Sequence, residues 1–148
     1  MFNIFDLSRV FGKIPNKDAI TRSFDWSGQQ DGMVPQGIAL HDNKVFYSLY
    51  PKPGYDAEGT SARVVVHDAS SMKEIGSFDL PEGITHAGGL DFDKHGKLLV
   101  SDTHSLCKLD WQKAMEDGNC SNSILGHVGL DGLNGSCVAL NNNNDQVF

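Results

Sequence analysis

The chain has 148 residues, of which 39% are hydrophobic and 16 are glycine, a composition that suits one domain of short segments and many turns. Its net charge of −7, without any cluster of lysines and arginines, argues against nucleic acid and anionic membranes as partners. No apolar run approaches the ~18 residues of a membrane span. The first residues lack the pattern of a signal peptide, so the sequence leaves the compartment open.

Residues 1–33 form the first segment and do not match the pattern that follows. The stretch FDLSRVFGKI predicts a short helix that begins at Asp6 or Ser8, since both residue types are good N-caps. The stretch SFDWSG fits the outer strand of a preceding β unit. We therefore expect residues 1–33 to be a distinct N-terminal segment.

Residues 34–84 predict one four-stranded unit. Its four segments are rich in β-branched and aromatic residues, which favours strands. They are residues 35–40, 44–50, 63–68 and 74–80. A long polar loop with two prolines and two glycines separates the second segment from the third.

Residues 85–133 repeat the pattern, with one addition. The predicted strands are residues 87–92, 97–102, 105–110 and 121–127. Residues 111–118 predict a short helix with Asp110 as its N-cap and Gly118 as its end. A third unit, residues 134–148, starts with a predicted strand over 136–140 and continues into a second at 146–148.

The units align with one another. Gly37 falls on Gly89 and then on Cys137, at spacings of 52 and 48 residues, and Val45–Ser48 falls on Leu98–Ser101. Four strands at a period near 50 residues are typical of a β-propeller blade. We therefore expect an all-β chain of β-propeller-like, four-stranded antiparallel blades, about two and a half units long. Because propellers close with four to eight blades, we expect a fragment of a larger propeller, completed by remaining blades or by self-association.

The stretch GLDFDKHGKLLVSD, residues 89–102, resembles a blade of the six-bladed SMP-30/gluconolactonase, strictosidine-synthase-like and NHL-repeat group. The resemblance implies a fold and does not fix a function. The calcium-dependent lactonases of that group carry an acidic ligand in an E-G-P-x-W segment. Here the corresponding stretch is VPQG, with Gln36 in place of the carboxylate, so the chain departs from the lactonase pattern.

A candidate site follows from the expected architecture. In a propeller, the loops before each inner strand and after each second strand gather on one face. We expect a ligand-binding face formed by Gln36, Tyr50, Tyr55, His86, His104 and Asn134, with Asp56 and Glu58 nearby.

Asp102 with His86 or His104 is the candidate pair for a divalent metal such as calcium, or for general-base chemistry. A structural role competes with each assignment. Asp102 also suits a turn in which its carboxylate accepts backbone N–H groups. His86 suits a structural histidine, and His104 an exposed surface residue.

The three cysteines contain no C-x-x-C motif, so neither a disulfide scaffold nor a zinc module is expected. Cys107 and Cys137 lie in strand patterns and are expected to be buried and inert, whereas Cys120 is expected to be exposed.

Two functions remain open at this point. The first is a non-catalytic propeller module that binds a protein or small-molecule ligand on its loop face. The second is a metal-dependent hydrolase of the lactonase type, with a site shared with further blades. A purely structural repeat is a third, weaker reading, and whether the chain is an enzyme stays undecided.

Overall fold

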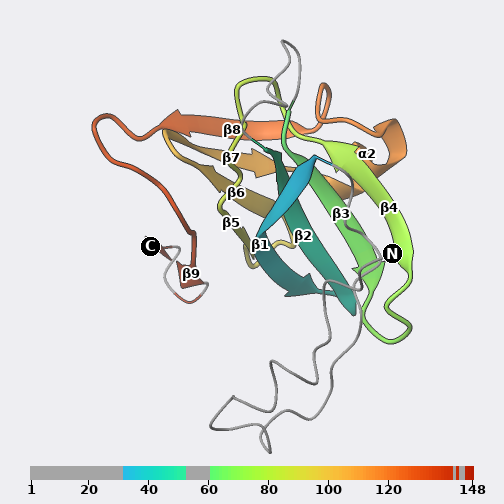
Figure 1. Cartoon of the computed structure of the whole chain (residues 1–148). Helices are drawn as coiled ribbons and strands as arrows, with labels where there is room; N and C mark the ends of the chain where they lie inside the picture. The colour runs from blue at the N-terminus through green and yellow to red at the C-terminus, as the bar shows by residue number, and fades with distance from the viewer. Residues whose placement is uncertain (1–31, 53–60, 142, 144–145) are drawn as a thin grey trace, which may run out of the picture.

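The structure is a computed structural model that describes residues 32–52, 61–141, 143 and 146–148. The helix and strand predicted within residues 1–31, and the loop residues Tyr55, Asp56 and Glu58, lie outside these ranges. The described chain contains two four-stranded antiparallel sheets and one two-stranded hairpin (Figure 1). The prediction of an all-β chain with four-stranded antiparallel sheets is therefore confirmed.

The first sheet has its strands in chain order. They are β1 (Met33–His41), β2 (Lys44–Pro51), β3 (Arg63–Asp68) and β4 (Glu74–Asp79). Asp42 and Asn43, which join β1 to β2, both have positive φ, at 46° and 56°. This backbone matches the right-handed twist of the two strands, and Asp and Asn are among the residues that tolerate it. The pairing of β1 with β2 shifts between Pro35 and Ile38, where β1 is irregular.

The second sheet has the same order and one inserted helix. Its strands are β5 (Gly89–Phe92), β6 (Leu98–Asp102), β7 (Ser105–Leu109) and β8 (Ile124–Gly129). Helix α2 (Trp111–Asp117) lies between β7 and β8 in the chain. The Asp110 side chain accepts a hydrogen bond from Lys113 N, and Gly118 ends the helix with φ 68°, as predicted. No helix among the described residues is both long and apolar enough to span a membrane.

A short hairpin follows the second sheet. It consists of β9 (Leu140–Asn141) and β10 (Gln146–Val147), which pair in antiparallel fashion. Of the strand predicted over residues 136–140, only Leu140 belongs to a strand, which is β9. β8 also begins later than predicted, because residues 121–123 form a turn in which Ser123 N donates to Cys120 O.

One apolar core lies between the two sheets. From the first sheet it takes Phe46, Val64, Val66 and Phe78. From the second sheet and α2 it takes Leu90, Phe92, Leu98, Val100, Cys107, Leu109, Trp111 and Ala114. Phe46 lies edge-on to Phe92 and Trp111, with ring centroids 4.8 and 5.1 Å away. Such buried aromatic contacts contribute strongly to core stability, and they fix the second sheet against the first.

The backbone of the three units comes into close contact at the aligned glycines. A Cβ atom on Gly37 would lie 3.3 Å from Gly88 O, and one on Gly89 would lie 2.7 Å from Cys137 Cα. Glycine is needed at these positions because any side chain would push the neighbouring backbone away. The three positions that align in the sequence, 37, 89 and 137, therefore lie in succession in space.

The cysteines follow the predictions only in part. Cys107 is buried as expected, but Cys120 is buried and Cys137 is exposed, so both of those predictions are wrong. Cys120 reaches the core because Gly118 turns the chain back from α2 toward β4, where Asp79 N donates to Gly118 O. At the third unit Val138 is the buried side chain, and its neighbour Cys137 points outward, since neighbouring residues of an extended chain alternate.

Candidate functional site

The described residues form a cleft of about 450 Å³ between the two sheets, at the end where β4 passes to β5. One wall is the connecting segment Pro81–Ile84, and the other is formed by β7, β8 and the turn before β7. The lining residues are Pro81, Glu82, Gly83, Ile84, Asp102, His104, Ser105, Cys107, Ile124, His127 and Gly129. The volume lies within the range of small-molecule sites.

The first wall is held by main-chain hydrogen bonds. Ile84 N donates to Pro81 O at 3.1 Å, which closes a tight turn, and Gly83 supplies the positive φ of 89° that this turn requires. Ala62 N donates to Ile84 O, and Leu80 N donates to Ala62 O. These bonds hold the segment against the residue that directly precedes β3 of the first sheet. Ile84 points into the core, whereas Glu82 at the tip of the turn is exposed.

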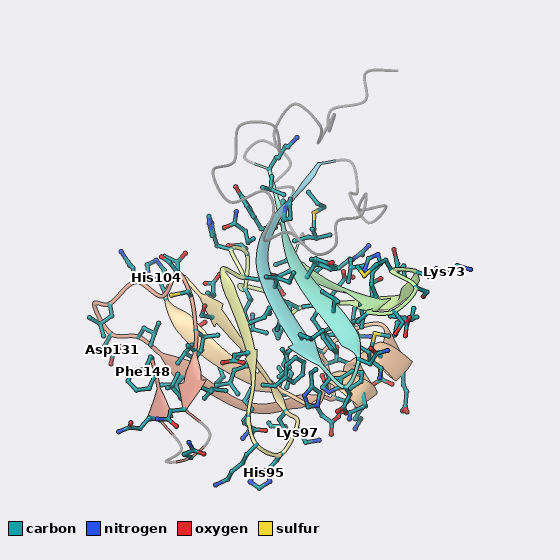
Figure 2. All side chains as sticks on the ribbon, turned by 90° about the horizontal axis from the view of Figure 1, so that it is seen from below. Lys73, His95, Lys97, His104, Asp131 and Phe148 are labelled. Carbon is teal, nitrogen blue, oxygen red and sulfur yellow. The ribbon has the colours of Figure 1, made fainter. Side chains whose placement is uncertain are left out.

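The second wall includes the tight turn between β6 and β7, where Asp102 pairs with Ser105. His104 lies exposed at this turn, and its carbonyl oxygen accepts a hydrogen bond from Leu130 N at 2.8 Å. Figure 2 shows His104 far from His95, which marks the turn at the opposite end of the sheet. His127 reaches the cleft from β8, directly across from Cys107 of β7.

The electrostatic character of the cleft is acidic. Asp102 and Glu82 supply carboxylates, His104 and His127 supply imidazoles, and none of the described lining residues is lysine or arginine. Burial raises the pKa of the Cys107 thiol to about 11, so this side chain is a neutral thiol near pH 7 and a poor nucleophile. The cleft is therefore suited to binding donors and cations rather than anions.

Asp102 is 6% exposed, and its carboxylate has a structural partner. Its Oδ1 accepts a hydrogen bond from His86 N at 2.8 Å. Together with the bond from Gly88 N to Ser101 O, this contact fixes the segment before β5 against the end of β6. The carboxylate thus accepts a backbone N–H group, as the structural alternative expected, but the donor is His86 before β5 and not a residue of the turn after β6.

Two further predicted site residues meet beside this contact. The rings of Tyr50 and His86 stack with their centroids 4.5 Å apart and an angle of 19° between their planes. Tyr50 is half-buried and His86 is exposed. The structure thus joins Tyr50, His86 and Asp102 in one continuous group, and Asp102 links this group to the cleft.

The remaining predicted residues lie nearby or outside the described ranges. His104 lines the cleft with Asp102. Asn134 is exposed and precedes Gly135, whose N donates to Thr103 O at 2.9 Å. Gln36 is exposed where the pairing of β1 is irregular, and neither Gln36 nor Asn134 lines the cleft. Tyr55 lies outside the described residues.

A metal site was the alternative use of Asp102 and His86. Within residues 32–52, 61–141, 143 and 146–148, no three His, Cys, Asp or Glu side chains are grouped closely enough to hold an ion. The contact between Asp102 and His86 uses the backbone N–H of His86, and its imidazole stacks on Tyr50.

Sequence reasoning missed Glu82 and His127. Glu82 belongs to a connecting segment without any motif, and its place in the wall follows from how the two sheets pack. His127 faces the cleft because it pairs with Cys107, which faces the core, and no local signal in the sequence marks this pairing.

No protein-family model matches this chain, and neither a curated protein nor a solved structure shows significant similarity to it. The function proposed below therefore rests on the geometry of the cleft and on the sequence pattern.

Proposed function

We propose that this chain is a ligand-binding β-propeller module, non-catalytic as it stands, whose loop face takes up a small molecule with an apolar body and a cationic or hydrogen-bond-donating group. The observation that carries the proposal is the cleft of about 450 Å³ that Asp102, His104 and Glu82 line. A cavity of this size favours a small molecule over a protein as the ligand.

The propeller part of the proposal has two supports. Each sheet has four antiparallel strands in simple chain order, as a blade requires. The aligned positions Gly37, Gly89 and Cys137 also lie in succession, as the inner strands of neighbouring blades would. Further blades, from remaining chain or from other copies, would be needed to close a ring.

The ligand chemistry follows from the walls of the cleft. Pro81 and Ile124 offer apolar surface, which favours burial of a hydrocarbon or aromatic body. The carboxylates of Asp102 and Glu82 favour a positive charge, and the imidazoles offer further hydrogen bonds. A negatively charged ligand would be repelled by these carboxylates, and none of the described lining residues is a lysine or arginine that could offset the repulsion.

The metal-dependent hydrolase has weaker support. Its support is that Asp102 lies close to the segment that carries His86. Against it, Asp102 Oδ1 already accepts the hydrogen bond from His86 N and is therefore less available to a metal ion. Calcium separates the two proposals, because an ion bound only by the folded state raises the melting temperature. A calcium-dependent rise that Asp102→Asn abolishes would favour the hydrolase.

The binding proposal is tested with two probes of the same size and opposite charge. Benzylammonium and benzoate are titrated into the ¹⁵N-labelled chain, and amide chemical shifts are followed by NMR. We expect benzylammonium to shift the amides of Glu82, His104 and His127, and benzoate to shift them much less. Glu82→Gln should weaken this binding, whereas Glu74→Gln, which changes an exposed glutamate of β4 outside the cleft, should not. Equal responses to both probes, or shifts confined to other surfaces, would contradict the proposal.

A further inference from the structure

Asp102 is the more buried of the two carboxylates that line the cleft. It is 6% exposed at the end of β6, whereas Glu82 lies exposed at the tip of the turn on the other wall. The surroundings of the two groups therefore differ, because water surrounds Glu82 and reaches Asp102 only in small part. A charge interacts more strongly with a partner at the buried position, since the effective dielectric constant is lower there.

One oxygen of the Asp102 carboxylate is fixed by the protein and the other is not. Oδ1 accepts the hydrogen bond from His86 N at 2.8 Å. No other described residue forms a hydrogen bond or ion pair with this side chain. Oδ2 thus remains an acceptor without a partner in the described part of the chain. An acceptor of a buried side chain is costly to leave in that state, which favours a donor supplied by a ligand or by water.

Aspartates elsewhere in the two sheets provide a contrast. Three of them are half-buried and form an ion pair with a lysine or arginine, and they are Asp79, Asp93 and Asp110. Asp102 is more buried than these three, and none of the described residues that line the cleft is a lysine or arginine. Because a buried carboxylate needs a positive or hydrogen-bonding partner, the position is suited to a cation that the ligand brings.

The lining of the cleft restricts the kind of cation. A quaternary ammonium group has no N–H and is recognised through the faces of aromatic rings. None of the described lining residues is phenylalanine, tyrosine or tryptophan. Tyr50 lies beside the cleft, and its ring stacks on His86. The polar groups on the walls are instead carboxylates, imidazoles and the Ser105 hydroxyl, which bind N–H groups through hydrogen bonds.

We propose that Asp102 Oδ2 is the anchor of the cleft and that the ligand is a protonated amine with at least one N–H group, which it donates to this oxygen. The inference rests on the proposed function, which requires only a small cationic or hydrogen-bond-donating ligand. A charge-assisted N–H···O bond is stronger and more directional than charge attraction alone. Asp102 is thus the residue that determines specificity, whereas Glu82 attracts any cation from the exposed wall.

The test compares two probes of equal charge and nearly equal size that differ in one N–H group. Dimethylbenzylammonium and trimethylbenzylammonium are titrated into the ¹⁵N-labelled full chain. Their dissociation constants are obtained from the amide shifts of Glu82, His104 and His127. We expect the dimethylated probe to bind about tenfold tighter or more, because the trimethylated probe has no hydrogen to donate to Oδ2.

Three variants connect this preference to Asp102. Asp102→Asn keeps an oxygen for the His86 N–H group but replaces the second acceptor by an amide NH₂ group, so the preference should disappear. Asp91→Asn is the matched control, because Asp91 is a half-buried aspartate outside the cleft that also accepts a backbone N–H group, from Leu140 N at 2.7 Å. It should leave both dissociation constants unchanged. Glu82→Gln should weaken both probes by the same factor, since its charge attracts either cation.

The possible outcomes separate this inference from the proposed function. If the two cations bind equally and benzoate is rejected, the anchor is wrong and the proposed function stands. If the preference for the N–H probe persists in Asp102→Asn, another group is the acceptor and the assignment to Asp102 is overturned. If neither cation binds, or if benzoate binds equally well, the proposed function fails and this inference fails with it. The comparison of the two cations uses the unmodified chain, so it does not depend on the folding of any variant.

Discussion

Ser48 of β2 makes hydrogen bonds that join the two sheets, and its removal is a direct test of how they are held together. Its Oγ accepts a hydrogen bond from Gly37 N at 2.8 Å and donates one to Ala87 O at 2.6 Å. Ser48 is completely buried, so water does not replace these partners when the hydroxyl is removed. Ser48→Ala therefore leaves one donor and one acceptor of the backbone unsatisfied.

The expected cost follows from the two lost bonds. A net contribution of ~1 kcal/mol for each gives a decrease in the free energy of unfolding of about 2 kcal/mol. For a protein of this length, such a change lowers the melting temperature by roughly 4–8 °C. Urea denaturation followed by circular dichroism measures the first quantity, and a thermal scan measures the second.

Ser101 provides the matched control. It aligns with Ser48 in the sequence and is equally buried, but its Oγ has no hydrogen-bond partner among the described residues. Ser101→Ala removes a desolvated hydroxyl without breaking a bond, so we expect a change within about 0.5 kcal/mol. If both variants lose the same stability, or if Ser48→Ala is neutral, the bridging role assigned to Ser48 is wrong.

Three other predictions concern buried groups. His67→Leu should stabilise the chain more at pH 5.5 than at pH 7.5 in urea titrations. The reason is that burial lowers the pKa of His67 in the folded chain below its usual value of about 6.5, so the folded state loses stability relative to the unfolded state as the pH falls below that value. An equal gain at both pH values would contradict this. Cys137 alone should react with a thiol reagent in the native chain at pH 8, because burial raises the pKa of both Cys107 and Cys120 to about 11; rapid labelling of all three by mass spectrometry would contradict the core packing. Gly89→Ala should cost ~2 kcal/mol of unfolding free energy in urea titrations because its Cβ would collide with the next unit, whereas Gly126→Ala, in open space, should cost far less; equal costs would argue against the close approach.

Features encoded over a few residues could be predicted from the sequence. Asp110 and Gly118 mark the two ends of α2 because capping depends on neighbouring backbone groups alone. In the turn Asp93–Gly96, Asp93 Oδ1 accepts hydrogen bonds from His95 N and Lys97 N, and Gly96 has φ 72°, which is again a local arrangement. Period-two patterns similarly located the strands of both sheets.

Features that depend on packing could not be predicted. The burial of Cys120 follows from the path of the chain after α2, where Gly118 meets β4, and nothing in NCSN encodes that contact. Glu82 and His127 are distant in the sequence and line the two walls of one cleft only because the sheets pack together. The stacking of Tyr50 on His86 lies between these cases, since the alignment placed both residues on one face and the structure shows them in contact.

The position of α2 has a consequence for how this chain unfolds. The helix belongs to the second sheet by sequence, but Met115 contacts the Gly76 position of β4, and Asp79 N donates to Gly118 O. Asn119 also forms an isolated bridge with Asp79. Detaching either sheet therefore breaks contacts of the other, so the two behave as one cooperative unit. Calorimetry should accordingly record one transition for both sheets, with a calorimetric enthalpy equal to the van't Hoff enthalpy.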